Sequence, residues 1–271
     1  MLAAKAGATI HDMPLPRIQS IELNDQPWVP AALRDTVIEA LSLTLKWGRI
    51  LEGLVDPFAG FLREAGTRRV LDLGAGAGAP GELLASALAA RGTPVDWILT
   101  DLFPRPGVWR RIAARVPTIS HVDQPIDATA IPGELSRDRA RTLLNVLHHF
   151  PRPLARAVIR DAIESRAPIF IAEGFERTPL GFLPFAPLGV PALYASPLLA
   201  RDRRLARILL TWVTPAALAA SIWDGFVSTL RVYTEPELRE MAEDAPYRWT
   251  YGNYRFAPFG KGYYFYGVPI V

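Results

Sequence analysis

The stretch VLDLGAGAGAPGELL, residues 70–84, decides the fold of this chain. A strand-like apolar run is followed at once by Gly74, Gly76, Gly78 and Gly81, and then by a helix-like run. Glycine loses more conformational freedom on folding than any other residue, so four glycines within eight residues indicate a backbone that something approaches closely. In α/β sheets, nucleotides bind where a strand ends and a helix begins. The stretch therefore predicts a nucleotide-binding turn.

The composition is that of a folded globular protein. Half of the 271 residues are hydrophobic and 21% are charged, and the length suits one large domain or two small ones. The net charge is only +3, so we expect no nucleic-acid partner. Cysteine is absent, which excludes a disulfide framework and a zinc–thiolate site. We expect no metal site, a cytoplasmic protein, and a loose tail at the start of the chain.

Strand-like and helix-like runs alternate along the middle of the chain, which predicts a mainly parallel sheet covered on both faces. The predicted strands are 68–73, 95–101, 141–147 and 168–174, and the predicted helices between them are 80–92, 106–116 and 152–165. Two helices, 30–46 and 48–64, come before this core. After it come a helix over 235–245 and two aromatic-rich strands, 247–256 and 262–269, able to pair antiparallel.

The glycine turn fits two kinds of nucleotide site. Gly74-x-Gly76-x-x-Ala79 matches the dinucleotide fingerprint of nicotinamide-dependent enzymes. Asp72-x-Gly74-x-Gly76-x-Gly78 is similar to the first motif of S-adenosylmethionine-dependent methyltransferases. A carboxylate at Asp72 favours the second, because it can accept a hydrogen bond from the ammonium group of S-adenosylmethionine (SAM) or from backbone near it. A pyrophosphate gains nothing from that carboxylate; an ordinary glycine-rich turn is the third alternative.

Two further acids follow in the places that such a site needs. Asp101 ends the run WILTD, where both nucleotide interpretations require an acid for the ribose hydroxyls; the alternative is a helix cap or turn. Asp127 and Ala128 stand before another turn. In SAM-dependent methyltransferases an acid at the end of the third strand meets the adenine amino group, and an Asx turn is the alternative here.

With these residues in place, the chain resembles the class I SAM-dependent methyltransferases over residues 68–173 and, more loosely, 228–271. The motifs that carry the resemblance are VLDLGAGAGAPG, LTDLFP, IDATAIP and LLNVLHHFPRP. It implies a Rossmann-like α/β fold: a seven-stranded, mainly parallel sheet with an antiparallel C-terminal hairpin, N-terminal helices and a helical lid insertion. It also implies SAM as the cofactor. The implied cofactor contacts are Asp72, Gly74, Ala75, Gly76, Gly78, Asp101, Leu102, Asp127, Ala128 and Asn145.

We divide the chain accordingly. One methyltransferase domain is predicted over 1–271, with an N-terminal helical cap over 20–66 and a cofactor-binding core over 67–174. A lid insertion follows over 175–228, and 229–271 completes the core.

Half of the four histidines lie together, at His148 and His149, after the fourth predicted strand. A hydroxyl nucleophile needs a base, and histidine has a suitable pKa. The alternative is that both residues cap the strand and pack the next helix. Adjacent residues usually point apart, so we expect at most one of them to face the site. Asn145 is predicted to position cofactor or substrate.

The insertion is expected to select the acceptor. Residues 178–200 carry no charge, but five prolines and two glycines argue against a continuous membrane-spanning helix. They predict either a helical lid buried against the sheet or a lid over an apolar substrate. Contact with a membrane through Arg201, Arg203, Arg204 and Arg207 is a further possibility. Predicted acceptor contacts are Trp28, Phe185, Trp223 and Asp224, although Asp224 could instead cap a turn before Gly225. Glu22, Asp25 and Trp28 are expected to cover the cofactor from the N-terminal side.

We therefore expect SAM-dependent methyl transfer to a small, largely apolar or lipid-like acceptor, with O-methylation first and N- or C-methylation open. An NAD(P)-dependent oxidoreductase is one alternative. A non-catalytic nucleotide-binding or membrane-associated module is another.

Overall fold

The fold is built on one seven-stranded sheet, and its topology confirms the predicted fold class. The structure, a computed structural model, describes residues 15–242 and 245–270, so the predicted tail before residue 15 lies outside it. The strands are β1 (Arg69–Leu73), β2 (Asp96–Thr100), β3 (Ile119–His121), β4 (Ala140–Leu144), β5 (Ile169–Glu173), β6 (Tyr247–Phe256) and β7 (Gly260–Pro269). Their order is β3-β2-β1-β4-β5-β7-β6. β1 to β5 are parallel, whereas β7 runs antiparallel to β5 and β6.

The helices follow the predicted alternation. The α-helices are α1 (Ala31–Trp47), α2 (Val55–Glu64), α3 (Ala79–Ala90), α4 (Pro106–Arg115), α5 (Gly133–Ser136), α6 (Arg152–Glu164), α7 (Ala186–Leu199), α8 (Arg204–Ile208), α9 (Ala216–Arg231) and α10 (Glu235–Ala242). Short 3-10 turns are η2 (Leu23–Asp25), η3 (Glu52–Leu54), η4 (Leu147–His149) and η5 (Leu183–Phe185), and η6 (Leu209–Val213) is a π-helical turn. Of the predicted helix 48–64, the α-helix covers only residues 55–64. Arg49 has a left-handed backbone, and Glu52–Leu54 form the 3-10 turn η3 that leads into α2.

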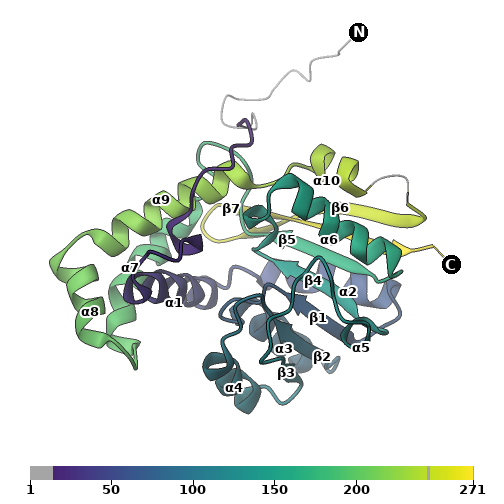
Figure 1. The fold of residues 1–271 in the computed structure, drawn as a ribbon, viewed down its shortest axis with the longest axis horizontal. Helices are drawn as coiled ribbons and strands as arrows, with labels where there is room; N and C mark the ends of the chain where they lie inside the picture. The colour runs from purple at the N-terminus through teal and green to yellow at the C-terminus, as the bar shows by residue number, and fades with distance from the viewer. Residues whose placement is uncertain (1–14, 243–244, 271) are drawn as a thin grey trace, which may run out of the picture.

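The core lies between the sheet and the helices on its two faces. α6 and α10 pack together on one face, and α2 contacts α3 on the other (Figure 1). Phe58 of α2 packs edge-to-face against Phe170 of β5 and Phe61 packs against it at a tilt, with ring centroids 4.9 and 5.2 Å away. Tyr266 of β7 lies 5.3 Å from Phe61 and joins the antiparallel hairpin to this core. Buried aromatic groups of this size dominate the hydrophobic contribution to stability.

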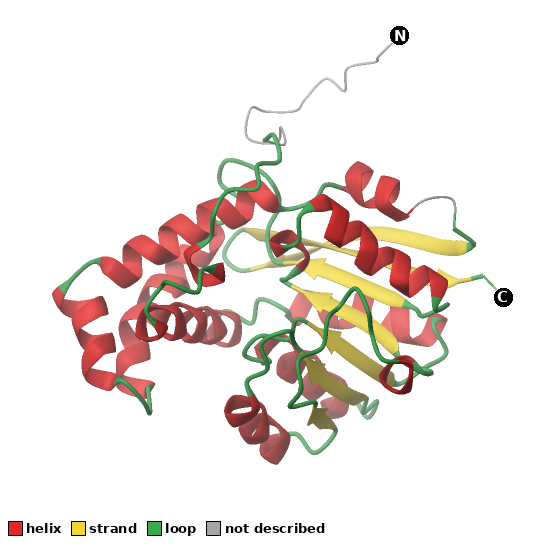
Figure 2. Ribbon diagram, in the orientation of Figure 1, coloured by secondary structure: helices red, strands yellow, loops and turns green. Residues whose placement is uncertain are grey.

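A second group of helices stands at the carboxyl ends of the parallel strands. α1, α7, α8, η6 and α9 pack together there and are called the helical layer below. Figure 2 shows the arrowheads of β4 and β5 pointing toward it. Residues 175–228 are thus mostly helical, as predicted, but α9 continues past the expected boundary to residue 231. The layer therefore covers the edge of the sheet where the predicted site residues lie.

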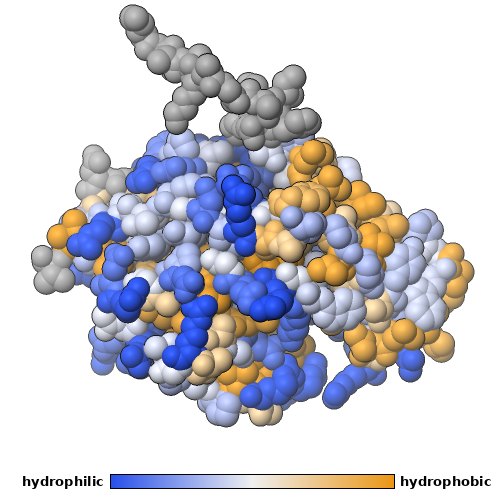
Figure 3. All heavy atoms as spheres, turned by 180° about the vertical axis from the view of Figure 1, so that it is seen from behind, coloured by the Kyte–Doolittle hydropathy of each residue, from blue (hydrophilic) through white to orange (hydrophobic). Residues whose placement is uncertain are grey.

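The helical layer exposes many apolar side chains, gathered on one side of the molecule in Figure 3. They include Tyr194, Leu198, Leu205, Trp212, Val213, Ile222 and Phe226. No single helix of the described residues is long and apolar enough to cross a membrane, although the bent pair Arg204–Val213 and Ala216–Arg231 meets that test of length and composition. Arg207 is fully buried and pairs with Glu39 and Asp202, so its predicted membrane contact is wrong.

Candidate active site

The glycine turn after β1 has two kinds of glycine. Gly74, Gly76 and Gly78 have φ values of +70°, +54° and +78°, a region that favours glycine. A Cβ on Gly74 would lie 2.7 Å from a methyl group of Val146, and one on Gly78 would lie 2.8 Å from Ile112. A Cβ on Gly76 would meet nothing within 4 Å. At Gly74 and Gly78, the close approach to the backbone that the sequence predicted is therefore made by side chains of the protein itself. Of these three glycines, Gly76 alone faces open space.

Asp101 lies beside this open glycine, at the end of β2. Its Oδ2 accepts the backbone N–H of Gly76 at 2.8 Å, and its Oδ1 accepts that of Phe103 at 2.8 Å. Trp109 holds the other side of the turn by donating to the Gly76 carbonyl at 3.0 Å. Each carboxylate oxygen has a further lone pair, so Asp101 can still accept hydroxyl hydrogen bonds. Leu102 follows it and is half-exposed.

Asp72 is directed into the sheet. Its carboxylate is buried and accepts hydrogen bonds from the Trp97 indole N–H and the Thr142 hydroxyl, both at 3.1 Å. Burial raises the pKa of Asp72 to about 7, although both hydrogen bonds act in the opposite direction. Asp72 thus joins β2 to β4 beneath the turn, and a direct contact with the cofactor ammonium group stays a prediction.

The segment after β3 returns to the same edge of the sheet. Ile126 donates its backbone N–H to the Asp101 carbonyl at 2.9 Å, which places Asp127 and Ala128 next to the end of β2. Oδ1 of the exposed Asp127 accepts the backbone N–H of Thr129 at 2.8 Å and its hydroxyl at 2.7 Å. This is the Asx turn that was the alternative to adenine binding. Contact of Asp127 and the buried Ala128 with adenine stays a prediction.

Asn145 ends β4 in a left-handed conformation, with φ +56°. Its Oδ1 accepts the backbone N–H of Gly174 at 2.6 Å, and its own N–H donates to Ala172 at 2.8 Å. Asparagine tolerates this conformation better than most residues. The side chain therefore ties β4 to the end of β5; its role toward cofactor or substrate is a prediction.

The two histidines face the same way. Their ring centroids lie 4.2 Å apart, so the expectation that these adjacent side chains point apart is wrong. Which of them faces the acceptor stays a prediction. The reason is local: η4 is a helical turn, in which successive side chains do not alternate as they do in a strand. Nδ1 of the buried His148 lies 2.8 Å from Oε2 of Glu173. The other oxygen of Glu173, Oε1, accepts a hydrogen bond from the His148 backbone N–H.

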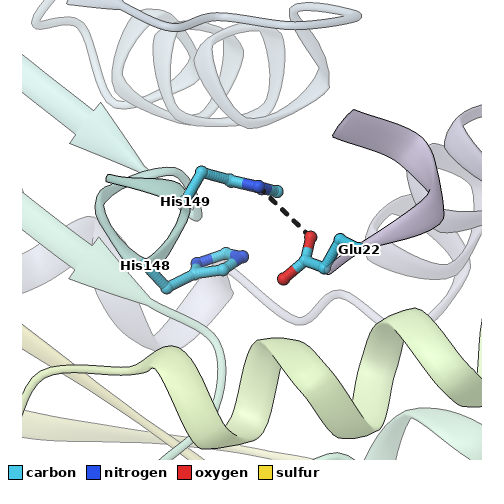
Figure 4. Close-up of side chains that lie close together, drawn as sticks. All are labelled: Glu22, His148 and His149. Carbon is cyan, nitrogen blue, oxygen red and sulfur yellow. Dashed lines mark ion pairs between the residues drawn. The ribbon is translucent and has the colours of Figure 1, made fainter. Parts of the chain in front are cut away.

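His149 meets the N-terminal segment. Its Nδ1 lies 3.0 Å from Asp25 and 3.2 Å from Glu22 (Figure 4). Burial disfavours the charged ring, but the two carboxylates outweigh it and raise the pKa of His149 to about 9. Arg231 of α9 pairs with the same two acids, at 3.1 and 2.8 Å. Glu22 and Asp25 thus lie beside the histidines at the end of β4. Their predicted role as a cover over the cofactor stays a prediction.

Two residues of this cluster were not predicted. Glu173 ends the apolar run IFIAE, and an acid after a buried strand is a signal that could have found it. Arg231 is the last residue of α9 and the single arginine of that helix, and it carries no comparable signal.

The predicted acceptor residues are divided between surface and core. Trp28 is 68% exposed, and Trp223 is 47% exposed while its indole N–H donates to the Ile21 carbonyl at 2.9 Å. Phe185 is 3% exposed and packs against three other phenylalanines, so it offers an acceptor little surface. Asp224 accepts the backbone N–H groups of residues 23 and 24 at 2.6 and 3.0 Å.

Asp224 lies inside α9, so the alternative of a capped turn before Gly225 is wrong; the carboxylate instead caps the distant turn η2. Burial raises the pKa of its carboxyl to about 6; the nearby charges of Glu22 and Asp25 add to this shift, and the two backbone hydrogen bonds oppose it. Trp223 and Asp224 together fasten the segment before α1 onto α9.

No protein-family model and no curated protein matches this chain. Solved structures do match it. The O-methyltransferase NcsB1 from neocarzinostatin biosynthesis, solved with SAM and 2-hydroxy-5-methyl naphthoic acid, is 15% identical, with a TM-score of 0.51 over 89% of this chain and 59% of that one. Magnesium protoporphyrin IX methyltransferase from Synechocystis, solved with SAM, is 14% identical, with a TM-score of 0.45 over 92% and 88%. The methyltransferase domain of bacterial CtHen1 is 14% identical, with a TM-score of 0.48 over 81% and 99%.

At these identities the likeness concerns the fold. This chain has the fold of the class I SAM-dependent methyltransferases, as its motifs predicted.

Proposed function

We propose that this protein is a SAM-dependent methyltransferase. The observation that carries the proposal is the open backbone face at Gly76, held by a carboxylate oxygen of Asp101, at the carboxyl end of β1. The fit to SAM is good, because the open glycine leaves room for the methionine end and Asp101 retains lone pairs for ribose hydroxyls. Asp127 and Ala128 lie next along the same edge, where the adenine would be held.

The sheet order argues against the nicotinamide-dependent alternative. Dinucleotide-binding sheets have the order 3-2-1-4-5-6 with parallel strands. Here an antiparallel strand, β7, lies between β5 and β6. NcsB1, whose solved structure has this fold, contains SAM, which supports the same choice.

Bound SAM supplies an electrophilic methyl group, and the chain has to hold the acceptor in line and exclude water. A hydroxyl acceptor also has to lose its proton. Of the two histidines, His148 is the better placed base, because a hydrogen bond from Nδ1–H to Glu173 leaves Nε2 with a free lone pair that can accept a proton. His149 is less suitable, since its raised pKa keeps the ring protonated at neutral pH.

For the acceptor we propose a small, largely apolar molecule, methylated on oxygen. α7 contains no charged residue, and Trp28 and Trp223 expose aromatic surface on the segments that flank the site. A strongly charged acceptor would need paired charges in these walls. NcsB1 was solved with an aromatic hydroxy acid, an acceptor of this general kind. The exposed apolar residues of the helical layer also support a peripheral membrane contact. Arg207 takes no part in it, because its side chain is buried.

The test is a calorimetric titration of the chain with SAM and, separately, with NAD, followed by an acceptor screen that measures S-adenosylhomocysteine release. We expect SAM to bind and NAD not to bind, and apolar hydroxyl compounds to be the best acceptors. Trp223→Ala should weaken the acceptor more than SAM. Binding of NAD alone would favour the oxidoreductase, and SAM binding without turnover of any acceptor would favour a non-catalytic module. Sugars, nucleotides or amino acids as the best acceptors would contradict the apolar acceptor.

A further inference from the structure

One carboxylate and two imidazoles meet at the carboxyl end of β4. Glu22 precedes η2, whereas His148 and His149 belong to η4. One possible ligand atom from each residue lies within 4.8 Å of the other two, and Figure 4 shows both rings turned toward the Glu22 carboxylate. Glu22 is 2% exposed and His148 is 4% exposed, so the three groups converge inside the protein.

His148 is oriented from behind by another carboxylate. Its Nδ1 lies 2.8 Å from Glu173, and its backbone N–H donates to the same carboxylate at 3.1 Å. A carboxylate in this position accepts the Nδ1 proton, so the lone pair is on Nε2, which points toward Glu22. Histidines that bind metal ions are commonly oriented by a carboxylate in this way.

Glu22 is oriented just as firmly. Its Oε1 accepts the hydroxyl of Ser228 at 2.9 Å and pairs with Arg231 at 3.1 Å. Its Oε2 lies 3.2 Å from Nδ1 of His149. One oxygen is therefore held by α9, and the other is directed at the histidines.

The charges around the cluster are unequal. The carboxylates of Glu22, Asp25 and Glu173 surround the two rings, and Arg231 forms ion pairs with the first two. Among the described residues, Arg231 and the protonated ring of His149 oppose three carboxylates, so one negative charge is left over, and an excess of buried charge is costly. A divalent cation that displaces the His149 proton would offset that excess.

We propose that Glu22, His148 and His149 bind a divalent transition metal ion. Two imidazole nitrogens and one carboxylate oxygen are a donor set that suits Zn²⁺, Mn²⁺ and Fe²⁺, and they leave coordination positions open. Mg²⁺ prefers oxygen ligands and should bind more weakly. The proposal does not depend on methyl transfer. Because it uses Nε2 of His148, metal binding and the role of base exclude each other at that atom.

The test uses the full chain without a histidine tag, stripped with EDTA and titrated with Zn²⁺ and with Mn²⁺ by calorimetry. We expect a single ion to bind per chain. Glu22→Gln and His149→Gln should each weaken binding at least about tenfold, since even residues that only orient a ligand can have effects of that size. Glu22→Gln retains an oxygen for Ser228, and circular dichroism shows whether each variant is folded.

His121→Gln is the matched control, because His121 also lies beside a carboxylate, Asp123 at 2.8 Å, but outside the cluster. It should bind metal like the unaltered chain. A chain that binds neither ion would overturn the proposal, and so would equal affinity in both ligand variants. Loss of binding in the control as well would place the ion elsewhere, with the same consequence. The cluster would then be an ion-pair network around a protonated His149.

Discussion

The carboxyl edge of the sheet has two halves that are built differently. In the half around β1, β2 and β3, backbone geometry makes the site: a turn of glycines, one open face, and an acid that accepts a backbone N–H. In the half around β4 and β5, side chains make it, and buried histidines, carboxylates and an arginine support one another. Asp101 and Gly76 are 25 residues apart, whereas Glu22 and Ser228 are 206 apart. The first half is therefore local in sequence, and the second exists only once distant segments have packed.

The largest effect on SAM affinity is expected where the first half has its open face. Gly76→Val should reduce SAM affinity at least ~100-fold, equal to about 2.7 kcal/mol, because a β-branched side chain would fill the open face at an unfavourable positive φ. Isothermal calorimetry measures it. The control is Gly92→Val: Gly92 has φ +74° and equally open space, but lies at the end of α3. Equal SAM affinity in the two variants would remove Gly76 from the site.

The second half should respond in stability rather than in cofactor affinity. Phe185→Ala removes a ring that packs against Phe175, Phe182 and Phe256, and we expect a loss of about 3–5 kcal/mol in the free energy of unfolding. Urea denaturation measures this loss. Phe226→Ala, at a half-exposed position of α9, should change stability by no more than about 0.5 kcal/mol. A similar small change for Phe185 would show that the aromatic cluster is loosely packed.

Asp101 tests whether the acid of the first half does more than hold the turn. Asp101→Asn keeps an oxygen for one backbone N–H but loses the charge, so SAM binding should weaken by about 1.5–3 kcal/mol. Calorimetry at fixed salt is the measurement, and Asp123→Asn, a partly exposed acid farther along the same edge, is the control. Unchanged SAM affinity would mean that Asp101 has only a structural role.

The pH dependence of stability tests Asp72, which joins the two halves through Trp97 and Thr142. Its pKa is about 7 in the folded protein and 3.8 without the fold, so between these values the folded state binds the additional proton. Stability should therefore fall as the pH rises from about 4 to about 7. Asp72→Asn cannot titrate and should reduce this slope, which urea denaturation at several pH values would reveal. An identical pH dependence in both proteins would assign the slope to other groups.

The sequence by itself determined the sheet, the glycine turn and the acids beside it. Periodicity located the parallel strands except β3, whose three residues are too few to show a pattern, and it placed β6 at its observed bounds. Asp101 was predictable because a parallel strand delivers its last residues to the same edge as its neighbour. The sequence predicted that the glycines form a turn, but not why each position requires glycine. A Cβ on Gly74 or Gly78 would be too close to Val146 or Ile112, which lie far away in the sequence.

Tertiary structure decided the half around β4. Whether His148 and His149 point together depends on η4 being a helical turn, and their partners Glu22 and Asp25 arrive from a segment that α9 holds in place. Packing between distant segments likewise places Asp224 as the cap of η2 and buries Phe185 in the core, although both were predicted to contact the acceptor. The periodicity of hydrophobic residues and the preferences of turn residues act over a few residues, so the sequence alone reveals them. Buried charges are matched across the whole chain, and only packing determines which of them meet.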